Sequence, residues 1–139
     1  MHVPENVNYL AVLVAGIVIF LLGWLWYSVL CKNQWMALHG KTEAELKAPA
    51  QGSMAGMYIS HLVASLIIAW VLAVILNHFV ELDWMRGALV GVLCWLGFVA
   101  TTIYSNVVAT MKPKQLWVID AGFYLVAFAI AGAILAVWR

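Results

Sequence analysis

The run LWVIDAGFYLVAFAIAGAILAVW, residues 116–138, is the last of four long apolar stretches in this sequence, and it alone among them contains an acidic residue, Asp120. About 20 apolar residues in a helix cross the roughly 30 Å hydrocarbon core of a bilayer, so the run predicts a transmembrane helix. An ionised carboxylate at the centre of such a helix costs roughly 2.5–3.5 kcal/mol on insertion scales. Asp120 therefore needs a hydrogen-bonding partner, a neutral form or a functional reason.

Three further runs have the same length and apolar character, namely residues 7–30, 54–76 and 85–108. The chain of 139 residues is 66% hydrophobic and only 9% charged, which is far more apolar than a soluble domain of this size. We therefore predict an all-α integral membrane protein, a four-helix transmembrane bundle that forms a single domain over residues 1–139. The lipid bilayer is its expected main partner.

Composition argues against several classes of function. Seven Lys and Arg residues and a formal net charge of +1 give no basic patch, so nucleic acid is not an expected partner. Cys31 and Cys94 are far apart, and no C-x-x-C or H-x-x-x-H pattern is present. We expect no metal site and no cofactor, and we interpret both cysteines as small apolar packing residues.

The connections between the runs predict how the helices are arranged. Residues 77–84 and 109–115 are short connections, so the helices that they join should be antiparallel neighbours. The connection at 31–53 is longer, and Thr42 with Glu45 matches a capping box that predicts a short interfacial helix through Lys47.

Basic residues predict the orientation in the membrane. Five Lys residues lie in the 31–53 and 109–115 connections, whereas the other side of the membrane has only Arg86 and Arg139. Because positive charge favours the cytoplasmic side, we expect both termini outside and these two connections in the cytoplasm.

Polar residues inside the four runs gather in a single leaflet, the one beside the 31–53 and 109–115 connections. The other half of each run is almost wholly apolar. We predict a ligand-binding or proton-handling site in this leaflet, built from Tyr27, Tyr58, His61, Asn106, Asp120 and Tyr124. Nearby Thr101, Thr102 and Ser105 can bond to carbonyl groups of their own helix and by themselves indicate nothing.

Small residues continue these polar stripes at helical steps of three and four. Small side chains allow two helix backbones to approach closely, so they predict the packing surfaces between helices. The residues expected there are Gly16, Gly23, Gly87, Gly91, Ala127 and Ala131. Gly87 and Gly91 form a G-x-x-x-G pattern, which predicts close packing without naming a partner helix.

Asp120 and His61 each have a structural and a functional interpretation. Asp120 can bond to Tyr58, His61, Asn106 or a Thr hydroxyl and simply fix the register of the bundle, although intramembrane ionisable groups are by default functional. His61 can act as a proton carrier, because imidazole changes charge readily around neutral pH, or it can be a satisfied structural histidine. If the helices form one bundle, His61 and Asp120 should lie within direct or water-bridged hydrogen-bonding range, in one subunit or between subunits.

Several short segments resemble one known family. They are residues 8–12 (NYLAV), 23–28 (GWLWYS), 34–36 (QWM), 39–40 (HG), 95–102 (WLGFVATT) and 119–124 (IDAGFY). Together they are similar to the bacterial family catalogued as domain of unknown function 1761, with GWLWYS the most specific. The resemblance implies a four-span protein of the bacterial inner membrane. The family has no assigned activity, so the resemblance implies no catalytic residue. Cys31 differs from the family pattern, in which an aromatic residue is expected at that position.

Three classes of function are compatible with these patterns. The first is a small transport or ligand-binding protein; no polar stripe crosses the whole membrane, so a path for ions would lie between subunits of a homo-oligomer. The second is an enzyme or binding protein for a lipophilic small molecule, with His61 and Asp120 as an acid–base pair. The third is a non-catalytic assembly or accessory subunit. We favour the first class, and we expect Asp120→Asn to keep the fold.

Overall fold

The computed structural model describes residues 7–30, 33, 37 and 54–138, and almost all of these are helical. Helix α1 (Tyr9–Leu25) continues into a π-helical segment, η1 (Trp26–Leu30), and α4 (Met54–Leu76) is the second long helix. The third consists of α5 (Trp84–Cys94), the π-helical η2 (Trp95–Ala100) and α6 (Thr101–Ala109), and α7 (Lys114–Val137) is the fourth.

All four helices are long and apolar enough to cross a membrane. The prediction of an all-α protein with four membrane-spanning helices is therefore confirmed. The interfacial helix predicted within the 31–53 connection lies outside the described residues, as does Cys31. The helix ends lie within two residues of the predicted runs, which is the usual spread at helix termini.

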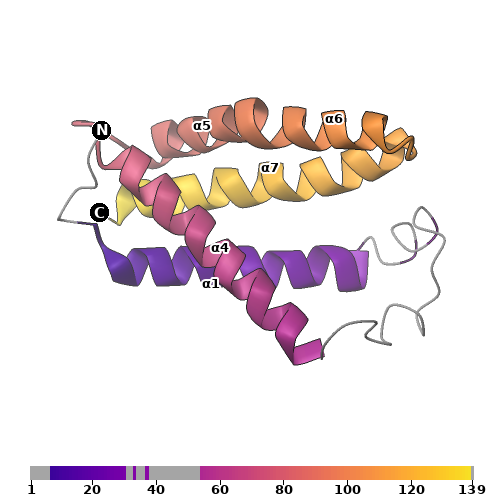
Figure 1. The fold of residues 1–139 in the computed structure, drawn as a ribbon. Coiled ribbons are helices and arrows are strands. Elements are labelled where there is room, and N and C mark those ends of the chain that lie inside the picture. The colour runs from indigo at the N-terminus through magenta and orange to yellow at the C-terminus, as the bar shows by residue number, and fades with distance from the viewer. Residues whose placement is uncertain (1–6, 31–32, 34–36, 38–53, 139) are drawn as a thin grey trace.

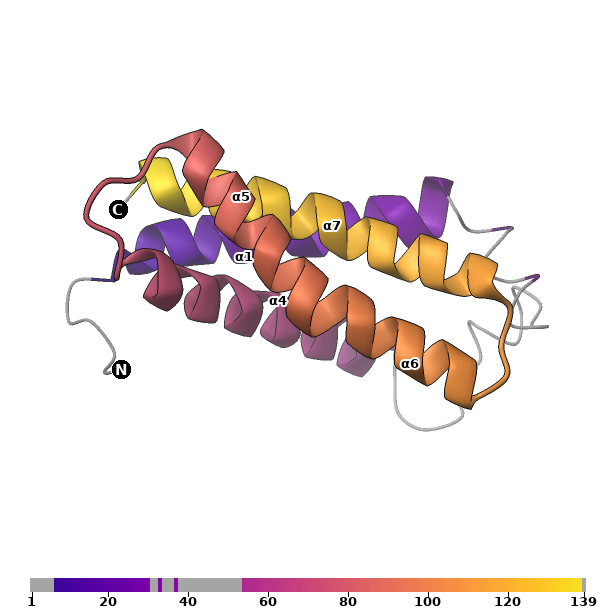
Figure 2. The same cartoon turned by 90° about the horizontal axis from the view of Figure 1, so that it is seen from above.

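Helix α7 is the central element of the fold. It packs against α1, α4, α5 and α6, and its contact with α5 is the most extensive in the molecule. Consecutive long helices run in opposite directions, so the start of α1 and the end of α7 lie at the same end of the bundle as the α4–α5 connection (Figure 1). The end of η1, the start of α4 and the α6–α7 turn lie at the opposite end (Figures 1 and 2). We call this second end the polar end, because the predicted polar site lies there.

Helix α4 crosses α1 and α7 obliquely (Figure 1). Its C-terminal half is packed into the core, where Ala69, Leu72 and Leu76 are buried. Towards the polar end the side chains of α4 become exposed, and this includes His61 on the same helical stripe as the buried Ser65. The first turns of α4 are therefore more exposed than its C-terminal half.

Glycine residues determine how closely α5 and α7 approach. A Cβ atom at Gly87 would collide with the carbonyl of Gly132, and one at Gly91 would collide with the carbonyl of Phe128. Gly132 in turn faces the carbonyl of Gly87. The two backbones are thus in direct contact, which is the arrangement that small residues permit in membrane helices.

The α1 helix uses its own glycines in the same way. A Cβ at Gly16 would lie 2.5 Å from Cδ2 of Leu66 on α4, and one at Gly23 would lie 3.3 Å from the Phe123 ring on α7. Ala127 and Ala131 of α7 are fully buried in the core between α1, α4 and α7.

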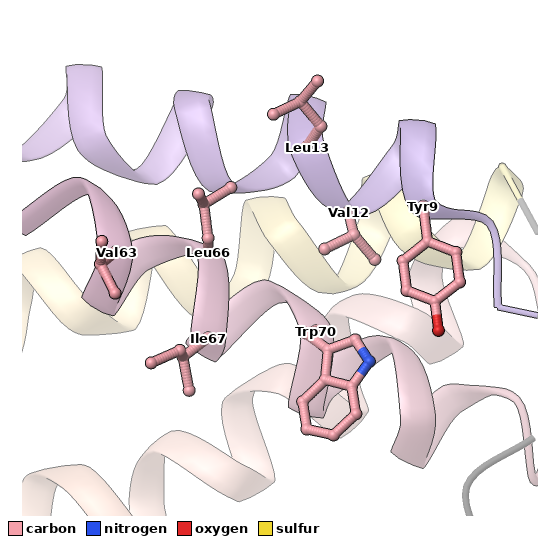
Figure 3. Close-up of a pocket in the computed structure, with 7 residues that line it drawn as sticks. All are labelled: Tyr9, Val12, Leu13, Val63, Leu66, Ile67 and Trp70. Atoms are coloured by element: carbon pink, nitrogen blue, oxygen red, sulfur yellow. The ribbon is translucent and has the colours of Figure 1, made fainter.

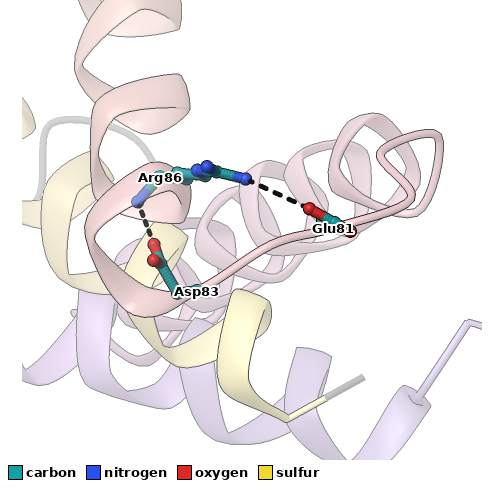
Figure 4. A network of polar contacts seen from close by, with 3 residues as sticks. All are labelled: Glu81, Asp83 and Arg86. Atoms are coloured by element: carbon teal, nitrogen blue, oxygen red, sulfur yellow. Dashed lines mark hydrogen bonds and ion pairs between the residues drawn. The ribbon is translucent and has the colours of Figure 1, made fainter.

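Side-chain caps start two of the helices at the end away from the polar site. Asn8 accepts a hydrogen bond from the amide of Ala11 and donates from Nδ2 to the carbonyl of Trp138, at 3.3 Å, which ties the start of α1 to the end of α7. Asp83 accepts the amide of Arg86 at 2.8 Å, and the Arg86 guanidinium lies 3.9 Å from Glu81 (Figure 4). Such caps satisfy amides that have no partner within the helix.

Candidate functional site

Tyr27 and Asp120 form a hydrogen-bonded pair at the polar end. The Tyr27 hydroxyl donates to Oδ1 of Asp120 at 2.7 Å, and both residues are half-buried. Asp120 is in the second turn of α7, about 9 Å along the axis from its first residue at 1.5 Å per residue. When the carboxyl group is ionised, a bond of this kind is charge-assisted and stronger than a bond between neutral groups. Residues from the first and last long helices thus meet at membrane depth.

Two indole groups bind the backbone on either side of Asp120. Nε1 of Trp26 donates to the carbonyl of Ile119 at 3.1 Å, and Nε1 of Trp95 donates to the carbonyl of Ala121 at 2.8 Å. Three consecutive residues of α7 therefore accept side-chain hydrogen bonds from α1–η1 and from η2. Because apolar surroundings offer an indole N–H no water, these bonds hold α7 at a defined depth and rotation.

A third indole also connects α7 with η2, but here the donor is on α7 and the acceptor is on η2. Nε1 of Trp117 donates to the carbonyl of Ala100, the last residue of η2, at 2.9 Å. The Trp117 ring also contacts Tyr104 edge-on, with ring centroids 5.7 Å apart. The segment of α7 around Asp120 is consequently fixed from both sides.

Both π-helical segments start at the tryptophans that bind α7, namely Trp26 for η1 and Trp95 for η2. Single π-helical turns are uncommon and occur frequently at functional sites. Neither tryptophan is among the site residues predicted from the sequence. The available signal was that Trp26 lies within the GWLWYS segment and that Trp95 begins the WLGFVATT segment. Neither segment shows which carbonyl group the indole binds.

Aromatic rings from η1 and α7 cluster around Phe123, beside the Tyr27–Asp120 pair. Phe123 is buried at the centre, and its ring centroid lies 5.6 Å from that of Tyr27, 6.5 Å from that of Trp26 and 4.7 Å from that of Tyr124. Tyr124 is half-buried and lies one helical turn after Asp120. Phe123 was not predicted as a site residue, because a lone Phe in an apolar run has no distinguishing feature.

His61 and Tyr58 lie on the exposed part of α4. The backbone carbonyl of His61 accepts the hydroxyl of Ser65, and the Tyr58 ring contacts Phe20 of α1 at 6.4 Å. In the part of the chain that the structure describes, no hydrogen bond or ion pair joins His61 to Asp120. Contact through water or between subunits stays a prediction.

The polar residues of α6 are exposed as well. Asn106 lies one turn from the end of α6. Thr101 and Thr102 donate to the carbonyls of Gly97 and Phe98, four residues earlier, at 2.9 and 2.7 Å. Both threonine hydroxyls thus bond to carbonyl groups within their own helix, and neither donates to Asp120.

An apolar groove lies between α1 and α4, on the half of the bundle away from Asp120 (Figure 3). The Tyr9 and Trp70 rings lie at one end of it, and aliphatic side chains form the rest. Its lining consists of Tyr9, Val12, Leu13, Val63, Leu66, Ile67 and Trp70. The groove is separate from the polar site.

Fold and site together define an integral membrane protein of four helices with a hydrogen-bonded carboxyl group in one leaflet. The family model described as "Protein of unknown function (DUF1761)" matches residues 10–136, and the chain belongs to this family. No curated protein and no solved structure matches the chain.

Proposed function

We propose that this protein binds a small ligand, or transports it, at a site around Asp120 in the leaflet nearest the 31–53 connection. The observation that supports this most directly is the hydrogen bond from Tyr27 to Asp120. Carboxyl groups at this depth are costly and are by default functional. The three donors aimed at residues 119–121 would keep such a group in one orientation.

Binding is favoured over catalysis by the position of His61. An acid–base pair needs both groups within hydrogen-bonding reach of the reacting atoms. Among the described residues His61 makes no bond to Asp120 and lies exposed on the divergent part of α4. An enzyme acting on a lipophilic substrate is therefore the weaker alternative.

We propose further that the protein is a homo-oligomer. Tyr58, His61, Ser105 and Asn106 are exposed within or near the ends of membrane-spanning helices. Lipid cannot satisfy polar groups in the hydrocarbon region, whereas another copy of the chain can. This arrangement would also place a path for transport between subunits.

The proposed location is the bacterial inner membrane, with both termini outside. Lys112 and Lys114 lie at the polar end and Arg86 at the other, which agrees in direction with the positive-inside rule. A cysteine introduced at residue 112 of a chain without other cysteines should react with a membrane-impermeant maleimide only after the cells are opened. Reaction in intact cells would mean that the true orientation is the reverse of the proposed one.

The binding site can be tested with dicyclohexylcarbodiimide, an apolar reagent that reacts with carboxylic acids inside membranes. The carboxyl oxygen adds to the central carbon of the reagent while its proton moves to a nitrogen, and acyl transfer to nitrogen then gives a stable N-acylurea. We expect one adduct, mapped by peptide mass spectrometry to residue 120. An accessible site carboxyl reacts in this way, whereas a sealed structural carboxyl does not.

Two variants serve as controls for this experiment. Asp120→Asn should elute as a folded particle of the parent's size and carry no adduct. Glu81→Gln, at the exposed α4–α5 connection, should label as the parent does. A folded parent that gains no adduct at residue 120 would mean that Asp120 is sealed, and the proposed site would be wrong.

A further inference from the structure

The groups around Asp120 have a combined chemistry that is more specific than that of a carboxylate alone. The rings of Tyr27 and Tyr124 are half-buried beside it, and both lie within 5.6 Å, centroid to centroid, of the buried Phe123 ring. Trp26 extends this group on the α1 side, and Phe128 extends it along α7, with its ring 6.4 Å from Tyr124. We call these five rings with Asp120 the aromatic–carboxyl site.

We infer that the aromatic–carboxyl site takes a lipophilic organic cation, such as a substituted ammonium or phosphonium ion. This inference rests on the proposed function and names the ligand class of the same site. A carboxylate attracts the positive charge, and the faces of tyrosine, tryptophan and phenylalanine rings attract it through their quadrupoles. The apolar substituents of such an ion gain burial against the same rings.

Other ligand classes fit the described residues less well. A dehydrated inorganic cation needs several oxygen ligands at once. The carbonyls of Ile119 and Ala121, which are adjacent to Asp120, already accept indole N–H groups. Within residues 7–30 and 54–138 no three His, Cys, Asp or Glu side chains lie close enough to hold a metal ion. The carboxylate would repel an anion, and a neutral apolar molecule would gain no electrostatic attraction from it.

The test uses two ions of the same shape and opposite charge, tetraphenylphosphonium and tetraphenylborate. Binding of each is measured by equilibrium dialysis against the full-length protein in phosphatidylcholine nanodiscs, with empty nanodiscs as the blank. We expect saturable binding of the phosphonium ion and only partitioning of the borate. Asp120→Asn should weaken phosphonium binding by roughly 30-fold or more, since it removes the opposite charge from a partly buried pair.

If Asp120→Asn does not fold, substitutions of the aromatic residues still test the inference. Tyr124→Leu should weaken phosphonium binding by roughly 3- to 10-fold through the lost cation–π attraction. Phe98→Leu, at an exposed position of η2, should leave it unchanged. Equal saturable binding of both ions, or phosphonium binding that neither Asp120→Asn nor Tyr124→Leu weakens, would overturn the inference.

The carbodiimide reaction distinguishes failure of the ligand class from failure of the site. Saturating phosphonium should protect Asp120 from the reagent, and tetraphenylborate should not. If Asp120 is labelled but phosphonium neither binds nor protects, the ligand class is wrong and the site stands. If Asp120 is not labelled in the folded parent, the proposed function itself is wrong.

Discussion

Asp120 is held by a tyrosine from a helix 93 positions earlier in the chain. The Tyr27 hydroxyl satisfies one oxygen of the carboxyl group and sets its direction. A hydrogen bond to a charged group contributes roughly 1.5–3 kcal/mol to stability, more than a neutral bond does. The pair therefore has both a structural and a chemical consequence, and the two can be separated by mutation.

Tyr27→Phe removes the hydroxyl and keeps the ring against Phe123. We expect the midpoint of thermal unfolding in detergent to fall, corresponding to roughly 1–3 kcal/mol, with the helical circular dichroism of the folded state unchanged. Tyr9→Phe is the matched control, because Tyr9 is 61% exposed and its hydroxyl has no hydrogen-bond partner among the described residues. Equal midpoints for the two variants would mean that the Tyr27–Asp120 bond contributes no stability.

The sequence predicted that Asp120 needs a hydrogen-bonding partner, but it did not name Tyr27, whose hydroxyl is one in the structure. Tyr27 was among the predicted site residues, yet the expected partners were Tyr58, His61, Asn106 or a threonine. Depth within the membrane can be counted along a helix, so the leaflet was predictable. The angle at which α4 crosses its neighbours leaves no periodic signal, and that angle decides which side chains reach α7.

At the scale of helices, three indole bonds connect α7 to its neighbours near Asp120. Each crosses between two long helices and ends on a backbone carbonyl. Trp26 and Trp95 bind on the two sides of the same turn, and each starts a π-helical segment. These bonds account for the position of the Asp120 turn better than apolar packing alone, since packing is not directional.

Trp26→Phe and Trp95→Phe each remove one indole donor and keep an aromatic ring. We expect each to cost roughly 0.5–2 kcal/mol in detergent unfolding and to change the rate at which carbodiimide labels Asp120, because the α7 turn loses one fixed contact. Trp84→Phe, 60% exposed at the start of α5, should change neither quantity. Unaltered labelling rates in both variants would show that the indoles do not position Asp120.

Gly91→Ala tests the close contact between α5 and α7. The added methyl group would collide with the carbonyl of Phe128, so we expect destabilisation of roughly 1–3 kcal/mol by overpacking. Gly97→Ala is the control, because a Cβ there meets nothing within 4 Å. Unfolding curves with the same midpoint for the two variants would contradict the direct backbone contact between these helices.

Much of the helix arrangement was predictable, and the reasons are physical. A membrane-spanning helix needs a long apolar run, so four runs gave four helices, and short connections required antiparallel neighbours. Gly87 and Gly91 lie where helical steps of four indicated a packing surface, although the sequence did not name α7 as the partner. The π-helical turns were not predictable, because neither η1 nor η2 differs in composition from its surroundings.

At the scale of the whole molecule, the polar and apolar halves differ in how closely the helices pack. Away from the polar end, the buried residues of α1, α4 and α7 form a continuous core. At the polar end, polar side chains of α4 and α6 are exposed. This difference leads us to expect that other copies of the chain cover the exposed polar residues.

We propose that Asp120 belongs to a binding site and is not required for the fold. Native mass spectrometry of the purified protein beside Asp120→Asn tests it most directly, by recording subunit number and any retained small molecule. We expect the same number of subunits, greater than one, in both proteins and a small molecule held by the parent alone. A variant that no longer assembles, or one that retains the same molecule equally well, would contradict it.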